Sequence, residues 1–204
     1  MRLYCSSRSP FVRKVMIVVH ELGLADRIAC EAARVTSADP NAAVMAHNPF
    51  GKIPTLVLDD GTAIYDSLVI CAYLDTLHGG RKLFPDKGAE RLAMLMRHSL
   101  GHGLIETLIV WLGERFRKQP DQSEKRIALC KMKIENTLRL LESEAPRLEA
   151  TPFDVGHAAI GVALSYMDFR FDAEGWRHGH AKLADWHATF SARPSAVATK
   201  FVDQ

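Results

Sequence analysis

The sequence predicts two domains of different class, an α/β domain over residues 1–78 and an all-helical bundle over residues 89–204. Before residue 78, short β-compatible runs alternate with segments of helical periodicity in the order β-α-β-α-β-β-α. This order is typical of a small sheet covered by helices. After residue 88, apolar residues recur about every 3.6 positions and no run resembles a strand. The Gly- and Pro-containing stretch at 79–88 separates the two patterns and is interpreted as a linker.

The first domain opens with a strand over residues 2–5 and a helix that begins at Pro10. Proline suits the first helical position because its missing N–H would have no partner there, and Ser9 is then the N-cap. Gly23 ends the helix, as a glycine commonly does after the last turn. The apolar positions of this helix recur at three- and four-residue steps and are Phe11, Val15, Val18, Val19 and Leu22.

A strand, a short helix, a hairpin and a third helix complete the first domain. Residues 28–35 favour a second strand, although Glu31 and its neighbouring alanines interrupt the pattern. The polar stretch over 36–51 includes a short helix at 41–46 and ends in an Asn-Pro-Phe-Gly turn. An Asp-Gly turn joins the strands 55–59 and 62–65. Asp66 and Ser67 then cap the third helix.

The second domain has four predicted helices, near 89–118, 121–144, 151–169 and 181–192. A capping box is predicted at the start of the third: Thr151 caps the amide of Asp154, and Asp154 returns a bond to the Thr151 N–H. Pro152 fits the first turn. The apolar run 158–164 indicates that this helix is the buried centre of the bundle.

Composition excludes several classes of function. The 26 basic and 24 acidic residues give a net charge of +2, and no block of like charges could follow a nucleic-acid backbone. No apolar run approaches the about 20 residues that span a bilayer, and Arg8, Arg13 and Lys14 interrupt any signal-peptide core. We therefore expect a cytoplasmic protein that contacts neither nucleic acid nor membrane. Four scattered cysteines indicate neither a disulfide framework nor a zinc site, and Cys5 is expected to be buried and inert.

A thioredoxin-like domain followed by an all-helical domain, in just over 200 residues, resembles the cytosolic glutathione transferases over the whole chain. The specific parts of the likeness are Ser9-Pro10-Phe11 with Arg13-Lys14, the run from Asn48 to Leu56, Asp66-Ser67 with Tyr73-Leu74, and Thr151 with Asp154. The likeness is to serine-type, bacterial-like members. It implies the glutathione transferase fold, glutathione as co-substrate, no metal, and a homodimer.

The resemblance assigns the catalytic role to Ser9, because the active serine of serine-type members immediately precedes Pro-Phe. A free thiol with a pKa near 8.5 is only about 3% thiolate at pH 7, so the enzyme must stabilise the anion. A hydroxyl at a helix N-terminus supplies such stabilisation. Ser6 and Ser7 are alternatives, since some members place the active residue slightly earlier. A cysteine at this position would favour thiol–disulfide exchange, whereas serine favours conjugation, related substitution or addition, or peroxide reduction.

The resemblance also implies how glutathione is held. Ile53-Pro54 is a candidate cis peptide before a strand, and the Ile53 main chain would pair with the cysteinyl part of glutathione. A helix N-terminus is a natural carboxylate site, so Ser67 would hold the γ-glutamyl carboxylate and Asp66 the ammonium. Lys52 either reaches the glycyl carboxylate or is simply solvated. The predicted glutathione-binding set is Phe11, Lys52, Ile53, Pro54, Asp66 and Ser67.

Two groups of residues in the helical domain remain. His98, His102 and Glu106 share one helix face, a spacing compatible with metal ligation but more typical of a polar face or a cleft. The resemblance implies that His102 is a cross-dimer contact, where members often have an acidic residue. His178, His180 and His187 also have ligand-like spacing, but loop histidines are usually polar surface. Apolar residues at helical spacing are mostly core, but the candidate walls for the second substrate are Leu104, Leu108, Trp111, Tyr166 and Phe169.

We therefore expect a glutathione transferase that activates glutathione for attack on a small apolar electrophile, as in detoxification. One alternative is a non-catalytic glutathione-binding or protein-interaction module of the same fold. Another is a glutathione-dependent peroxidase, lyase, dehalogenase or disulfide reductase.

Overall fold

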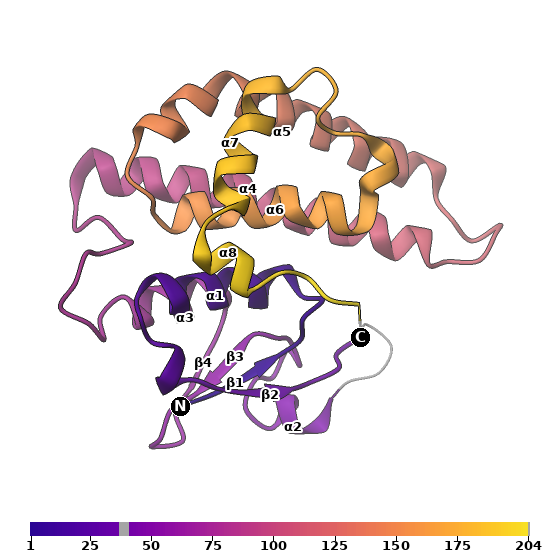
Figure 1. Ribbon diagram of the computed structural model, residues 1–204. Coiled ribbons are helices and arrows are strands. Elements are labelled where there is room, and N and C mark those ends of the chain that lie inside the picture. The colour runs from indigo at the N-terminus through magenta and orange to yellow at the C-terminus, as the bar shows by residue number, and fades with distance from the viewer. Residues whose placement is uncertain (37–40, 204) are drawn as a thin grey trace. The chain divides into compact units, whose positions relative to one another are not determined.

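The computed structural model describes residues 1–36 and 41–203, and it divides into two compact units (Figure 1). Unit 1 comprises Met1–Pro85 together with the chain from Pro194 onward, and unit 2 comprises Asp86–Arg193. The division near residue 85 falls inside the predicted linker. The C-terminal residues, in contrast, belong with the first unit rather than with the helical bundle. Residues 37–40 of the predicted polar stretch lie outside the described residues.

Unit 1 is built on a four-stranded mixed sheet in the order β2-β1-β3-β4. Its strands are β1 (Arg2–Cys5), β2 (Ala29–Ala32), β3 (Thr55–Val57) and β4 (Ala63–Ile64). β1 is parallel to β2 and antiparallel to β3, and β3 is antiparallel to β4. This is the predicted thioredoxin-like arrangement. β1 has its predicted range, whereas β2, β3 and β4 are shorter than the predicted 28–35, 55–59 and 62–65.

Helices cover both faces of the sheet (Figure 1). They are α1 (Pro10–Glu21), α2 (Ala42–Met45), α3 (Ser67–Leu74) and α8 (Pro194–Ala198), with a short 3₁₀ turn at Ala25–Arg27. α1 packs against α3 on one face, whereas Val44 of α2 joins Tyr4 and Val57 in an apolar cluster on the other.

The C-terminal segment is anchored on α1. Arg13, which is buried, donates a hydrogen bond of 3.3 Å to the carbonyl of Ala196 and stacks on Phe201, with 4.6 Å between the guanidinium carbon and the ring centre. These contacts explain why the residues after Pro194 fold with unit 1. The helix α8 was not predicted, since five residues carry too short a pattern.

Unit 2 is an all-helical bundle of α4 (Gly88–Arg115), α5 (Glu124–Ala150), α6 (Val155–Phe171) and α7 (Ala181–Ser191), with a 3₁₀ turn at Asp172–Glu174. α6 is the buried centre, as predicted, and residues 158–164 are all buried. Gly101 lets α4 approach it closely, because a Cβ at Gly101 would lie 2.4 Å from the Ala159 backbone. No helix of residues 1–36 and 41–203 has the length and apolar character needed to cross a membrane.

The predicted capping box at Thr151 is wrong by three residues. α6 begins at Val155, and Asp154 is its N-cap: the Asp154 carboxylate accepts from the His157 N–H at 3.0 Å. The His157 ring closes the box by contacting the Asp154 N–H at 3.2 Å. Thr151 instead ends α5, where its hydroxyl donates to the Arg147 carbonyl at 2.7 Å.

α5 also runs six residues past its predicted end and passes through Pro146. Its buried stripe continues through Leu141, Ala145 and Leu148, so packing of that face stabilises the last turns despite the proline.

Candidate functional site

Three predicted site segments lie at the same end of the unit 1 sheet, where their strands begin or finish. Ser9 follows the carboxyl end of β1, Ile53-Pro54 precede the amino end of β3, and Asp66-Ser67 follow the carboxyl end of β4. Because β3 is antiparallel to both of its neighbours, its amino end lies next to the carboxyl ends of β1 and β4. The register fixes the alignment, with Tyr4 opposite Thr55 and Leu56 opposite Ile64.

Ser9 is the N-cap of α1, as predicted. Its Oγ accepts a hydrogen bond of 3.3 Å from the Val12 N–H, and Pro10 occupies the first helical position. The cap uses a lone pair of the oxygen, so the hydroxyl proton remains available for donation. The side chain is partly exposed at the positive end of a 12-residue helix. This geometry suits a donor to an anion.

The two alternative serines have other surroundings. The Ser7 hydroxyl donates its proton to the Val202 carbonyl at 2.9 Å, so this donor is engaged within the protein. The Ser6 Oγ accepts from the Arg8 N–H at 3.3 Å and keeps its proton, but it lies outside a helix. Ser9 therefore combines an available proton with a helix N-terminus.

The loop before β3 presents the main chain of Ile53. The Ile53-Pro54 peptide bond is cis, as predicted. Among the described residues, the Ile53 N–H and carbonyl have no hydrogen-bond partner within the protein. Both groups are therefore available to an extended ligand backbone. Lys52 is exposed beside them.

Asn48 holds this loop in place, a role that the sequence pattern did not reveal. Its buried amide donates to the Lys52 carbonyl at 3.1 Å and to the Thr55 hydroxyl at 3.0 Å, and its oxygen accepts from the Phe50 N–H at 3.0 Å. The Thr55 hydroxyl in turn donates to the Lys52 carbonyl at 2.8 Å. The Asn-Pro-Phe-Gly pattern indicates a turn, but a single sequence does not show which backbone groups the Asn48 amide reaches.

Asp66 and Ser67 form the N-terminus of α3, as predicted. One carboxylate oxygen of Asp66 accepts from the Leu68 N–H at 2.9 Å and from the Val69 N–H at 3.5 Å. Asp66 is exposed, so its second oxygen is open to a cation. Ser67 is 2% exposed and begins the helix, where the first N–H groups have no helical partner. The pair thus offers an anion site and a cation site side by side.

Cys71, on α3, does not supply a reactive sulfur. It is fully buried, and burial raises the pKa of its thiol to about 12. A neutral, inaccessible thiol is a poor nucleophile.

Phe11, the predicted glutathione-binding residue of α1, is partly buried. It lies beside the buried Lys14, whose ammonium is 5.8 Å from the ring centre.

Comparison with known proteins places the chain in a family. Residues 8–77 match the family described as glutathione S-transferase, N-terminal domain. Over 178 residues, 86% of each chain, the protein is 30% identical to the GST-like protein YibF of Escherichia coli K12. The chain belongs to the glutathione S-transferase family.

Solved structures of the glutathione S-transferase family agree over the full length. A family member from Pseudomonas fluorescens Pf-5, solved with bound glutathione, has 37% identity and a TM-score of 0.95, covering 99% of both chains. A glutathione S-transferase from Methylobacillus flagellatus KT, solved with glutathione bound, has 30% identity and a TM-score of 0.88, covering 98% of this chain and 99% of that one. The predicted two-domain fold is confirmed.

The predicted histidine groups of unit 2 lie in different surroundings. On α4, His102 lies 3.5 Å from the Glu106 carboxylate, and the His98 and His102 ring centres are 5.3 Å apart. In the loop before α7, His180 is buried and contacts the Trp176 carbonyl at 2.8 Å. Over the described residues, no group of three or more His, Cys, Asp or Glu side chains is placed to hold a metal.

The candidate walls for the electrophile lie mainly in the core of unit 2. Leu104, Leu108, Trp111 and Tyr166 are at most 4% exposed, and Trp111 stacks on Phe171 with 4.4 Å between ring centres. Burial of this kind favours the interpretation that these four residues belong to the core.

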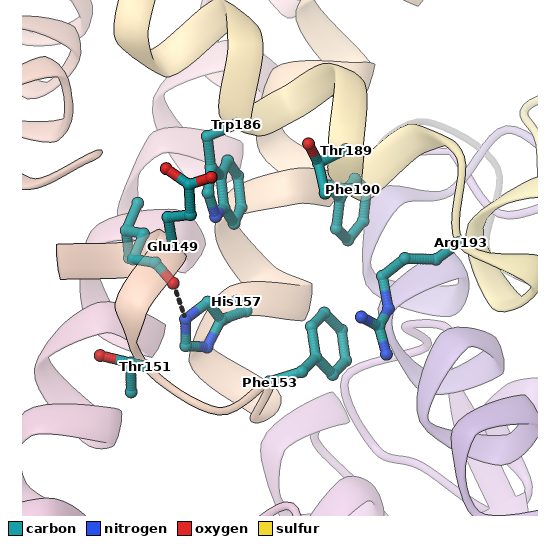
Figure 2. Close-up of a pocket in the computed structure, with 9 residues that line it drawn as sticks. Glu149, Thr151, Phe153, His157, Trp186, Thr189, Phe190 and Arg193 are labelled. Atoms are coloured by element: carbon teal, nitrogen blue, oxygen red, sulfur yellow. Dashed lines mark hydrogen bonds between the residues drawn. The ribbon is translucent and has the colours of Figure 1, made fainter. Parts of the chain in front are cut away.

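A pocket of about 130 Å³ lies elsewhere in unit 2, between the α5–α6 connection and α7 (Figure 2). The rings of Phe153, His157, Trp186 and Phe190 line it, and the Arg193 guanidinium lies 3.9 Å from the Phe153 ring centre. The His157 Nε2 contacts the Leu148 carbonyl at 3.1 Å, which fixes the orientation of this ring. A cavity of about 150 Å³ accepts a benzene ring.

Proposed function

We propose that this chain is a glutathione transferase of the serine type, in which Ser9 stabilises the glutathione thiolate for attack on a small apolar electrophile. The observation that carries this proposal is the Ser9 hydroxyl, which caps α1 through its oxygen and keeps its proton for donation. Structural relatives with glutathione bound support the choice of co-substrate.

Stabilising the thiolate is a modest energetic task. Lowering a thiol pKa by two units takes about 2.7 kcal/mol of preferential stabilisation of the anion. One hydrogen bond to a charged group contributes about 1.5–3 kcal/mol, and the end of a helix adds about 0.3–1 kcal/mol. Ser9 and α1 together therefore match the requirement. The displaced group leaves from the electrophile as the sulfur–carbon bond forms.

The remaining groups at this end of the sheet match the other parts of glutathione. The Ile53 main chain suits the cysteinyl backbone, and Lys52 suits the glycyl carboxylate. Ser67 suits the γ-glutamyl carboxylate, and the open oxygen of Asp66 suits the ammonium. Phe11 completes the proposed site beside α1, with Pro54 shaping the loop.

We also propose a homodimer that forms through α4. Leu92 and Met96 lie one turn apart on this helix and are 60% and 61% exposed, an apolar stripe that a partner would cover. In this arrangement His102, six residues beyond Met96 on the same helix, is the proposed contact to the partner's glutathione. The enzyme would act in the cytoplasm, in detoxification.

Replacement of Ser9 tests the proposal. With 1-chloro-2,4-dinitrobenzene, Ser9→Ala is expected to lower kcat about 10- to 100-fold, the value of one charged hydrogen bond, with the KM for glutathione changed less than about twofold. Ser7→Ala is the matched control and should keep full turnover, because its hydroxyl is engaged with Val202. Undiminished turnover in Ser9→Ala would move the role to Ser6 or to a backbone donor.

Retention on immobilised glutathione separates binding from catalysis. Binding without turnover of an aromatic halide, a peroxide or a mixed disulfide would assign the chain as a non-catalytic glutathione-binding module. Turnover of the mixed disulfide alone would assign a disulfide reductase.

A further inference from the structure

Three sulfur atoms meet beside the β2 edge of the unit 1 sheet. The Cys30 Sγ lies 3.8 Å from the Met16 Sδ of α1, and the Cys5 and Cys30 thiols hydrogen-bond to each other. Cys30 is exposed, and Cys5 and Met16 are partly exposed. Cys5 is thus only partly buried, which corrects the expectation that it is a buried cysteine. The proposed glutathione site uses none of these atoms.

The strand register separates the two cysteine backbones too widely for a relaxed disulfide. Cys5 is opposite Ala32, and Cys30 is opposite Leu3, so the two cysteines are offset by two residues on neighbouring strands. Two steps of about 3.3 Å and one strand spacing of about 4.8 Å place their Cα atoms about 8 Å apart. A disulfide needs less than about 7 Å without backbone movement. The side chains nevertheless converge, which suits an atom held between the sulfurs.

We infer that Cys5, Cys30 and Met16 form a binding site for one soft monovalent metal ion, Cu(I). Two thiolates and a thioether are the donors that select Cu(I) over hard cations. The donor set is too small for a structural zinc site, which takes four ligands, and its thioether is not among the Cys, His, Asp and Glu ligands of zinc. Metal–sulfur bonds of about 2.3 Å in a trigonal plane would separate the sulfurs by about 4.0 Å, close to the 3.8 Å between Cys30 and Met16.

Binding replaces two thiol protons by the metal ion. Cu(I) bonds to the Cys5 and Cys30 sulfurs in place of their protons, which pass to solvent, and the Met16 thioether adds a lone pair. No atom changes its oxidation state.

A competition titration tests the site. Cu(I) is added anaerobically to the full chain in the presence of the chromogenic chelator bathocuproine disulfonate, and the loss of chelate colour reports transfer. The wild type is expected to hold one Cu(I) per chain. Cys30→Ser should bind at least tenfold more weakly, and Met16→Leu several-fold more weakly. Cys130→Ser and Met132→Leu are matched controls that should bind as the wild type does. Cys130 is buried in unit 2, and the Met132 side chain is exposed on α5, so both lie outside unit 1.

A second readout avoids dependence on affinity alone. Bound Cu(I) should slow alkylation of Cys30 by iodoacetamide in the wild type, measured by peptide mass, and should slow it less in Met16→Leu. Circular dichroism checks that each variant is folded. The proposal is overturned if the wild type does not compete with the chelator, if Cys30→Ser binds equally well, or if mild oxidation links Cys5 directly to Cys30.

Discussion

Replacement of Asp154 should destabilise the helical bundle more than any nearby polar substitution. The Asp154 carboxylate caps α6, contacts the His157 ring at 2.7 Å and pairs with Arg97 of α4. Loss of an N-cap costs about 1 kcal/mol. Breaking a buried ion pair costs about 3–5 kcal/mol, and the Arg97 side chain is 13% exposed, which favours the lower value. Asp154→Ala should therefore cost about 4 kcal/mol.

Urea unfolding followed by tryptophan fluorescence measures this cost directly. The three tryptophans are Trp111, Trp176 and Trp186, all in unit 2, so the signal reports on the bundle. With a slope of about 2 kcal/mol per molar urea, the midpoint of Asp154→Ala should fall by about 2 M. Asp154→Asn keeps a capping acceptor but loses the charge, and should cost about 3 kcal/mol.

Thr151→Ala is the matched control, because its hydroxyl donates only to an exposed carbonyl at the end of α5. It should cost less than about 0.5 kcal/mol. If Thr151→Ala is as destabilising as Asp154→Ala, the capping box begins at Thr151 and the assignment of Asp154 is wrong.

The same carboxylate predicts a pH dependence. Burial tends to raise the pKa of Asp154, but hydrogen bonds from His157 and Arg97 outweigh it and hold the pKa below its ordinary value of 3.8. A carboxyl with a lowered pKa in the folded state stabilises the protein above its unfolded pKa and loses that contribution as pH falls through the folded value. The stability difference between wild type and Asp154→Asn should thus be constant near pH 6 and shrink below about pH 4.

Three further predictions concern glutathione and assembly. Asn48→Ala leaves the Phe50 N–H without its partner and removes one of the two donors to the Lys52 carbonyl. It should lower the free energy of unfolding by about 1–3 kcal/mol in urea titrations and raise the KM for glutathione; an unchanged KM would separate Asn48 from the site. Ser67→Ala should raise that KM about tenfold in steady-state assays with kcat preserved, and a fall in kcat instead would contradict a purely binding role. Met96→Lys should shift sedimentation velocity from dimer to monomer while Met132→Lys on α5 stays dimeric, and a dimeric Met96→Lys would remove α4 from the interface.

Local signals in the sequence predicted the helix starts and the cis bond in the candidate site. Pro10 after Ser9 marks the start of α1, and the Asp66-Ser67 pair marks that of α3, because capping chemistry is local and each residue acts within one turn. The cis bond at Ile53-Pro54 was predicted from its family motif. The convergence of these segments depends on strand register, which long-range pairing decides.

Features that depend on distant partners were missed. Asp154 became the N-cap because Arg97, 57 positions away, and the His157 ring both reach its carboxylate, whereas the Thr-x-x-Asp pattern also satisfies the local rule. Arg13 holds the C-terminal segment on α1 across 183 positions, so periodicity alone could not assign α8 to unit 1. The Cys5–Cys30 pair likewise arises only when β1 and β2 align.

The pKa of the glutathione thiol in the binary complex tests the central claim most directly. It is measured from the ultraviolet absorbance of the thiolate as pH is varied, in wild type and in Ser9→Ala at saturating glutathione. We predict a thiol pKa about two units below its free value in the wild type, and at least one unit higher in Ser9→Ala. The same pKa in both proteins would contradict thiolate stabilisation by Ser9.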